Sequence, residues 1–314
     1  MRPRALIIEP VHQVLLDKLL ACGYEYTLVR QISKQEALEA LPAYQGLITS
    51  NKLYVDKELI DAGSGLKWIG RMGSGMEIID VPYATSKGIL CVSSPEGNAN
   101  AVAEQALGML LSLLHNVVKS HNELQHMVWQ RDANRGSELS YKKIGIIGYG
   151  NNGSLFAEKL LAMGCTVYVY DPYVSGYEKP GLVPCASLEE LYPHIDVLSF
   201  HVPLTDLTRH YFNDIMLEAV RKDFYLVNLS RGAIVDLAAV ERGLLSGKIK
   251  GAAIDVWEQE PVTEVSRAGH DIFARLIQRP DFIGTAHIGG YSHEATYKMS
   301  YYVAQKLEPL LRQS

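Results

Sequence analysis

The sequence predicts an α/β protein with two doubly wound parallel sheets. Three observations lead to this class. The chain has 314 residues, about twice the length of a typical domain, so two domains are expected. Short apolar runs of strand length alternate with helical patterns in both parts of the chain. A long apolar helix pattern lies between the two alternating regions and predicts a connector.

The first part of the chain has its own alternation of strands and helices. Apolar runs at 5–9, 46–49, 67–70 and 89–92 predict strands, and the pattern at 11–21 predicts a helix. These runs precede any feature of the second alternating region. We therefore expect a separate α/β unit here.

A connector helix is expected after Pro95 and Gly97. Its apolar pattern extends from Asn98, the expected N-cap, to about Val118. The pattern of strands and helices then resumes and continues to about residue 284. Strands are predicted in this second region at 144–147, 166–170, 195–200, 224–229, 251–256 and 282–284.

A final helix is expected at about 292–311, after the turn at Gly289 and Gly290. If this helix packs back on the first region, that domain is discontinuous in sequence. We expect one domain at 1–95 with 291–314 and another at 96–290. The functional site would then lie in the cleft between them.

A glycine turn follows the apolar run at 144–147 and precedes a helical pattern. Gly148 allows the tight turn, Gly150 allows backbone to approach a pyrophosphate, and Gly153 allows close packing of the helix. Amides at the start of the helix attract phosphate groups without a side-chain cation. The order of strand, glycine turn, helix and second strand predicts a dinucleotide-binding βαβ unit.

Asp171 ends the second strand of this unit, where a carboxylate accepts hydrogen bonds from the adenosine ribose. Its charge would repel a 2′-phosphate, and no arginine follows it directly. NAD is therefore favoured over NADP as cofactor. The alternative is a structural βα turn with an ordinary aspartate at a strand end.

Composition excludes several other classes. The formal net charge is −5 and no basic run is interleaved with aromatic residues, so nucleic-acid binding is not expected. Four scattered cysteines, Cys22, Cys91, Cys165 and Cys185, favour neither a zinc cluster nor disulfides, and indicate a reducing cytoplasm. No apolar run has the length of a membrane span, and the apolar stretch near the N-terminus is too short for a signal peptide. The spacing of His115, His121 and His126 does not favour a metal site.

Seven ordered segments together match one family. By these segments the chain resembles the D-isomer-specific 2-hydroxyacid dehydrogenases, in particular the 3-phosphoglycerate dehydrogenase-like branch, without a regulatory C-terminal domain. The resemblance implies a Rossmann NAD-binding domain, a flavodoxin-like substrate domain with a cleft between them, and a homodimer formed through the nucleotide domain and the connector helix. The segments are 71–75, 97–104, 148–153, 201–205, 228–236, 251–261 and 286–290.

Three residues of these segments are the catalytic candidates. Arg231 follows a predicted strand, and its guanidinium suits a two-pronged grip on a substrate carboxylate. His287 ends another strand and is the expected acid in reduction and base in oxidation. Glu260 is expected to hydrogen-bond His287 and to favour its protonated form. Outside such motifs these residue types are more often surface ion-pair partners or loop residues.

The resemblance also implies binding residues. In the first domain, the backbone amides of Gly73, Ser74 and Gly75 are expected to bind the substrate carboxylate. In the second domain, Asp255 is expected to accept a hydrogen bond from the nicotinamide carboxamide. Substrate-binding candidates are Ser50, Asn51, Lys52, Gly73, Ser74, Gly75 and Arg231. Cofactor-binding candidates are Ser74, Gly148, Gly150, Asn151, Asn152, Gly153, Asp171, Pro172, His201, Val202, Pro203, Thr208, Leu229, Ser230, Asp255, Gly289 and Gly290.

The chain departs from the family pattern in three places. The loop 48–52 lacks the arginine that holds a substrate phosphate in the phosphoglycerate branch, with Lys52 as the nearest substitute. Asn152 stands where an apolar residue is usual. The segment between Glu260 and His287 is longer than usual and could shape the mouth of the cleft.

These observations predict an NAD-dependent oxidoreductase that transfers a hydride between nicotinamide and a small D-2-hydroxy acid or 2-oxo acid, including acids like 3-phosphoglycerate. The alternative is an NAD(H)-sensing regulatory protein on the same fold. Turnover of NADH with a panel of 2-oxo acids distinguishes the two.

Overall fold

The computed structural model describes residues 2–51, 53–177, 179–264 and 267–312. By internal contacts the chain divides into two compact units. The first comprises Met1–Asn100 and Gly290–Ser314, and the second comprises Ala101–Gly289. The division falls inside helix α5 (Pro95–Leu114).

The first unit contains a five-stranded parallel sheet in the order β2-β1-β3-β4-β5. This is the strand order of flavodoxin-like folds. The sequence did not predict β2, because this edge strand is short and mostly exposed and so lacks an apolar run. The strands are β1 (Arg4–Ile7), β2 (Glu25–Leu28), β3 (Gly46–Thr49), β4 (Trp68–Arg71) and β5 (Leu90–Ser93).

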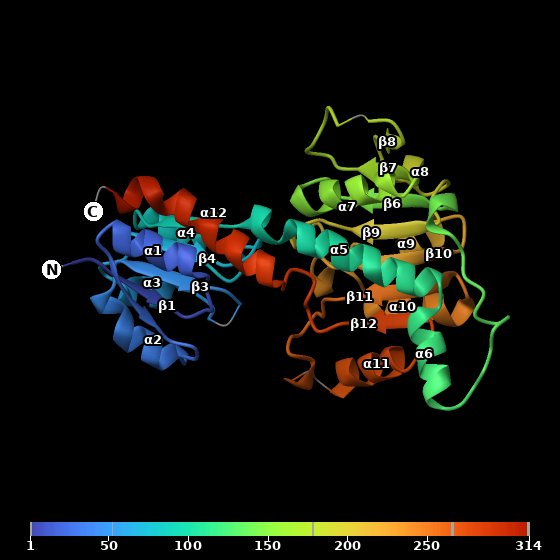
Figure 1. The fold of residues 1–314 in the computed structure, drawn as a ribbon, viewed down its shortest axis with the longest axis horizontal. Coiled ribbons are helices and arrows are strands. Elements are labelled where there is room, and N and C mark those ends of the chain that lie inside the picture. Colours follow the sequence, from blue (N-terminus) through green and yellow to red (C-terminus); the bar gives the residue numbers. More distant parts are fainter. Residues whose placement is uncertain (1, 52, 178, 265–266, 313–314) are drawn as a thin grey trace. The chain divides into compact units, whose positions relative to one another are not determined.

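Helices cover this first sheet on both faces (Figure 1). The C-terminal helix α12 (His293–Leu311) packs against β4, β5 and helix α1 (Gln13–Ala21), which lies beside it. A Cβ on Gly70 would lie 2.9 Å from Val303, so glycine in β4 allows this close packing. The remaining helices are α2 (Lys34–Ala40), α3 (Lys57–Ala62), α4 (Val81–Ser86) and the 3₁₀ turn η1 (Leu41–Ala43).

The second unit contains a seven-stranded parallel sheet in the order β12-β11-β10-β9-β6-β7-β8. Six of these strands follow the Rossmann order, and β12 extends the sheet at one edge. The predicted fold class is confirmed. The strands are β6 (Lys143–Ile147), β7 (Thr166–Tyr170), β8 (Leu182–Pro184), β9 (Val197–Phe200), β10 (Phe224–Asn228), β11 (Ile249–Ile254) and β12 (Phe282–Gly284).

Two apolar layers cover the faces of this second sheet. One layer joins the sheet to α5 and α7 (Asn151–Ala162), and the other joins it to α9 (Asp214–Ala219), α10 (Leu237–Ser246) and α11 (Arg267–Ile277). Strands buried on both faces explain why the sequence shows continuous apolar runs here. The other elements are α6 (Val117–Gln125), α8 (Leu188–Leu191) and the 3₁₀ turns η2 (Leu139–Tyr141), η3 (Gly232–Ile234) and η4 (Val262–Glu264).

The connector differs from the single helix predicted from Asn98 to Val118. Helix α5 begins earlier, at Pro95, where proline suits the first helical position. The helical path breaks at Asn116, whose φ of +54° is left-handed, and α6 starts at the next residue. Asn98 is therefore not an N-cap. Its side chain accepts a hydrogen bond from Ser74 instead.

Within the described residues, no single helix is long and apolar enough to cross a membrane. Helices α5 and α6 pass that test only when they are taken together, and they are bent by 61° at their junction.

Candidate active site

The glycine turn between β6 and α7 is held by close backbone contacts. Gly148 has a φ of +95°, and a Cβ on it would lie 2.5 Å from the carbonyl oxygen of His201. A Cβ on Gly153 would lie 2.0 Å from the carbonyl oxygen of Gly148. Among the described residues, nothing beyond its own chain neighbours lies within 4 Å of the Cβ position of Gly150. The turn is therefore tight at Gly148 and Gly153 and open at Gly150.

Asp171 at the end of β7 ties the glycine turn to the second strand. Its Oδ2 accepts from the backbone N–H of Tyr149 at 2.7 Å, and its Oδ1 accepts from that of Tyr173 at 2.8 Å. Each carboxylate oxygen can accept a further hydrogen bond. Asp171 is thus placed to hold the turn and still to accept from a hydroxyl group.

The two asparagines at the start of α7 differ in their surroundings. Asn151 is exposed, whereas Oδ1 of Asn152 is buried and has no hydrogen-bond partner in the described part of the chain. A buried amide oxygen without a donor is unfavourable unless a ligand or water supplies one. Asn152 therefore places a buried acceptor, without a donor among the described residues, in the first turn of α7.

The backbone of His201 contacts the glycine turn at Gly148, and Thr208 hydrogen-bonds within the loop that follows His201. The His201 ring packs on Phe156 of α7, with 5.2 Å between centroids, and Nε2 lies 2.8 Å from Oγ of Ser199. Burial lowers the pKa of His201 to about 4, so the ring is neutral near pH 7. Thr208 donates to the carbonyl of Pro203 at 2.7 Å.

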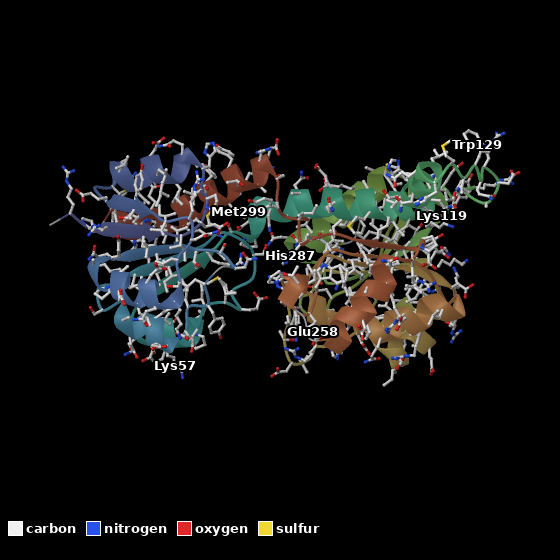
Figure 2. The ribbon with its side chains drawn as sticks, turned by 90° about the horizontal axis from the view of Figure 1, so that it is seen from below. Lys57, Lys119, Trp129, Glu258, His287 and Met299 are labelled. Atoms are coloured by element: carbon white, nitrogen blue, oxygen red, sulfur yellow. The ribbon has the colours of Figure 1, made fainter. Side chains whose placement is uncertain are left out.

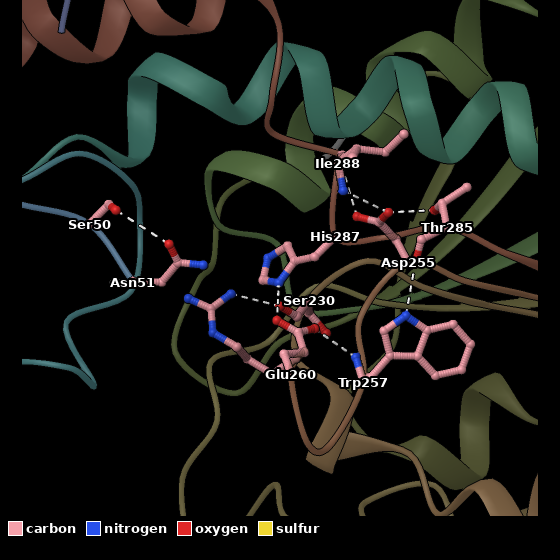
Figure 3. A network of polar contacts seen from close by, with 11 residues as sticks. Ser50, Asn51, Ser230, Asp255, Trp257, Glu260, Thr285, His287 and Ile288 are labelled. Carbon is pink, nitrogen blue, oxygen red and sulfur yellow. Dashed lines mark hydrogen bonds and ion pairs between the residues drawn. The ribbon is translucent and has the colours of Figure 1, made fainter. Parts of the chain in front are cut away.

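His287 and Glu260 form a close pair (Figure 3). Nδ1 of His287 lies 2.6 Å from Oε2 of Glu260, while Oε1 accepts from the backbone N–H of Trp257 at 2.8 Å. Because an ionised carboxylate can only accept, Nδ1 carries a proton and Nε2 is the ring atom left for chemistry.

Burial and the neighbouring groups of Glu260 set its charge state. Burial acts to raise the pKa of its carboxyl, but the hydrogen bond and charge of His287 act against burial. The N–H of Trp257 and the positive charge of Arg231 add to this effect, and the pKa lies below its usual value. Glu260 is therefore a carboxylate near neutral pH, and Arg231 is near enough to act on it.

Asp255 holds the turn that carries His287. Its side chain is 1% exposed and accepts from the backbone N–H groups of Ile288 at 2.9 Å and Gly289 at 2.8 Å, and from the hydroxyl of Thr285. Its own carbonyl accepts from His287 N–H at 2.8 Å. These bonds hold His287 at a φ of +53°, a conformation that is strained for a residue with a Cβ. The expected role of Asp255 at the nicotinamide carboxamide stays a prediction.

Buried Asn228 positions Arg231 at the end of β10. The Asn228 side chain accepts from Ser230 and donates to the carbonyl oxygen of Arg231 at 3.0 Å. Nη1 of Arg231 donates to the carbonyl oxygen of Ser230 at 2.6 Å. This role of Asn228 was not predicted from the sequence. A polar residue at the end of the apolar run at 224–227 was the available signal.

The strand order explains why Arg231, Glu260 and His287 converge. They follow β10, β11 and β12, which are neighbours in one parallel sheet. The glycine turn, Asp171 and His201 follow β6, β7 and β9 at the same edge, because the carboxyl ends of parallel strands share one edge. The structure brings these six candidate positions to one edge of the second unit.

The first unit contains the candidates at 50–52 and 73–75. Gly73 has a φ of +151°, and a Cβ there would lie 1.4 Å from Nη1 of Arg71, so only glycine fits this turn. The Ser74 hydroxyl donates to Asn98 at 2.8 Å, and the Ser50 hydroxyl donates to Glu9 at 2.5 Å. Lys52 lies outside the described residues. The binding roles of 50–52 and 73–75 stay predictions.

Comparison with known proteins identifies similar sequences and folds. The family profile "D-isomer specific 2-hydroxyacid dehydrogenase, NAD binding domain" matches residues 107–289. The hydroxypyruvate reductase of Thermotoga maritima is 32% identical over 276 residues, which is 88% of each chain. The D-3-phosphoglycerate dehydrogenase of Synechocystis sp. is 32% identical over 310 residues, covering 98% of this chain and 54% of that protein.

A solved structure has a similar fold over nearly the whole chain. The D-lactate dehydrogenase from Aquifex aeolicus, complexed with NAD and lactic acid, has a TM-score of 0.86 and 25% identity, with 99% and 96% of the two chains covered. Two D-3-phosphoglycerate dehydrogenases match 98% of this chain. The chain spans only 54% and 57% of their lengths.

The lowered pKa of His201 predicts a pH-dependent stability. The unfolded chain takes up a proton at this histidine below about pH 6.5, but the folded protein does so only below about pH 4. Stability is therefore lost as pH falls through this window. The His201→Gln variant keeps a nitrogen near Ser199 but has no titrating group. Between about pH 7.5 and pH 5, wild type should lose about 2 kcal/mol more of its unfolding free energy than this variant, measured with urea. Parallel pH dependences would contradict a neutral His201.

Proposed function

The chain belongs to the D-isomer specific 2-hydroxyacid dehydrogenase family, and we propose that it is an NAD-dependent oxidoreductase that interconverts a small D-2-hydroxy acid and its 2-oxo acid. The observation that carries the proposal is the 2.6 Å pair of His287 and Glu260, with Arg231 near enough to lower the pKa of Glu260. The relatives described above are named as dehydrogenases or a reductase, and all three catalytic candidates are present. An NAD-sensing regulatory role is therefore not favoured.

The second unit fits the dinucleotide. The turn is open at Gly150, where backbone can approach a pyrophosphate, and Asp171 has acceptor capacity for ribose hydroxyls. Asp171, by its charge, favours NAD over NADP. These features support NAD as the cofactor.

The chemistry follows from the arrangement of the side chains. When bound, nicotinamide supplies or accepts the hydride. His287 donates a proton from Nε2 to the carbonyl oxygen during reduction and accepts it from the hydroxyl during oxidation. Glu260 stabilises the protonated ring and fixes its orientation through Nδ1. Arg231 binds the substrate carboxylate and orients the adjacent carbonyl group.

A panel of 2-oxo acids identifies the substrate. In the loop expected to bind a substrate phosphate, the described residues Ser50 and Asn51 carry no positive charge. The panel therefore pairs hydroxypyruvate with its 3-phospho ester and adds glyoxylate, pyruvate and longer 2-oxo acids. NADH absorbance gives the rate for each acid.

The first prediction concerns the acid–base residue. His287→Asn should lower turnover of the best 2-oxo acid by about 100-fold or more and leave the dissociation constant of NADH within about twofold, because the proton donor is lost and the glycine turn is untouched. His121→Asn, at an exposed site on α6, is the matched control. Tight NADH binding by wild type without turnover of any acid would overturn the proposed function. Full activity of His287→Asn would remove this residue from catalysis.

A second prediction concerns cofactor choice. Asp171→Ala should weaken NADH binding by about tenfold or more, because hydrogen bonds from ribose hydroxyls to a charged group are lost. The same change should improve NADPH binding, because the repulsion of the 2′-phosphate disappears. Fluorescence titration with both nucleotides measures this. An unchanged NADH to NADPH preference would contradict the role of Asp171.

We also propose that the protein works in the reducing cytoplasm, because all four cysteines are free thiols.

We propose further that two copies pair through the surface around α6. Helix α6 has no buried residue, and Val117 and Leu124 are about half exposed. Trp129 lies at an outer edge of the second unit with 78% of its surface exposed (Figure 2).

A groove of about 420 Å³ lies beside this surface in the second unit. It is lined by α6, the end of α11 and β12, and combines apolar Val118, Val128 and Phe282 with charged Lys119 and Glu123. Two-fold pairing would bury the exposed apolar residues of each copy against the same surface of the other.

The pairing predicts a change of oligomeric state. Trp129→Asp should shift the protein from dimer to monomer in sedimentation velocity, because a buried charge without a partner opposes association. Leu245→Asp, at an exposed site on α10, should leave the dimer intact. A monomeric wild type, or a dimeric Trp129→Asp variant, would refute pairing at this surface.

A further inference from the structure

Trp257 lies beside the acid–base pair, in the loop that follows β11. It is 8% exposed and follows β11 by three residues. Its ring packs edge-on against Phe273 of α11, with 4.7 Å between centroids, and lies 6.3 Å from Phe282 of β12. The ring is therefore fixed by packing on more than one side.

Two hydrogen bonds join Trp257 to both halves of the acid–base pair (Figure 3). Its backbone N–H donates to Oε1 of Glu260 at 2.8 Å. Its indole Nε1–H donates to the carbonyl oxygen of Thr285 at 2.9 Å, two residues before His287. One residue thus links the segment of Glu260 to the segment of His287.

Two glycines allow neighbouring segments to approach Trp257. A Cβ on Gly232, the residue after Arg231, would lie 1.9 Å from the carbonyl carbon of Trp257. A Cβ on Gly284 would lie about 3 Å from the indole ring. The backbone that carries Arg231 therefore also rests on this residue, so Trp257 contacts the supports of all three catalytic candidates.

The longer segment between Glu260 and His287 supplies part of the support. It forms helix α11, whose Phe273 contacts the indole and whose Leu276 is fully buried. Arg275 of α11 makes a two-pronged ion pair with Glu241 of α10, at 2.5 and 2.9 Å. This pair and the buried leucine hold α11 in place behind the ring.

We propose that Trp257 is a positioning residue that fixes the distance and angle between His287 and Glu260 through its indole N–H. This inference rests on the proposed function. A hydrogen bond as short as that of His287 to Glu260 needs both partners held, and small displacements of a catalytic group lower rates strongly. The N–H is the decisive feature, because phenylalanine would fill much of the same space without donating to Thr285.

The test uses Trp257→Phe in the full chain. We expect turnover to fall about tenfold, with the NADH dissociation constant unchanged within about twofold. The alkaline fall in the reduction rate should move to lower pH, because a displaced Glu260 stabilises the protonated ring less. Trp68→Phe is the matched control: Trp68 is fully buried in the first unit and its Nε1 lies 3.4 Å from the Tyr24 hydroxyl. It should lower thermal stability and leave the pH profile unmoved.

A spectroscopic measurement reads the pair without turnover. In protein labelled with ¹⁵N at histidine, the Nδ1–H proton of His287, assigned by its loss in His287→Asn, should resonate far downfield in wild type and in Trp68→Phe. It should move upfield or broaden in Trp257→Phe. Phe273→Leu keeps the indole N–H but loosens its packing, and should give a smaller change of the same sign. This second variant decides the matter if Trp257→Phe does not fold.

The outcomes separate the two proposals. If wild type reduces a 2-oxo acid but Trp257→Phe matches it in turnover, pH profile and proton resonance, the positioning role is overturned and the proposed function stands. If Trp257→Phe and Trp68→Phe lose activity with the same unmoved pH profile, the role is merely structural and the proposal is wrong. If wild type turns over no acid, the proposed function fails and the inference fails with it.

Discussion

The buried carboxylate of Asp255 is the constraint on which the candidate active site depends. It receives three hydrogen bonds from the turn at 285–289, and its backbone carbonyl receives a fourth from His287. These bonds offset the strain of the left-handed backbone at His287 and fix where the imidazole leaves the sheet edge. A buried carboxylate is costly without partners, so this turn and Asp255 stabilise each other.

The second unit separates two tasks along one sheet edge. The strands β6, β7 and β9 lead to the glycine turn, Asp171 and neutral His201, and close backbone contacts and the bonds of Asp171 hold this region together. The strands β10, β11 and β12 present charged groups, Arg231, Glu260 and His287, held by buried polar side chains and by Trp257. Under the proposed function, cofactor affinity and proton transfer depend on different interactions, and substitutions can affect one without the other.

The structure shows the surroundings of two positions that were predicted to depart from the family pattern. Asn152 places a buried acceptor without a partner, among the described residues, in the first turn of α7. The longer segment after Glu260 becomes α11, which packs on Trp257 behind the acid–base pair. Both departures therefore concern the surroundings of the candidate residues rather than the candidates themselves.

The sequence by itself determined the fold class, the glycine turn and the strand-end position of Asp171, and it indicated Arg231, Glu260 and His287 as the catalytic candidates. These depend on local patterns: continuous apolar runs mark buried strands, and glycine is required wherever backbone segments nearly touch. Only the tertiary structure showed the break at Asn116, the edge strand β2, and the supporting roles of Asn228, Asp255 and Trp257. Such roles depend on partners up to 34 residues away along the chain, as in the bond from Gly289 to Asp255. A pattern of neighbouring residues carries no record of which distant donor will meet which acceptor.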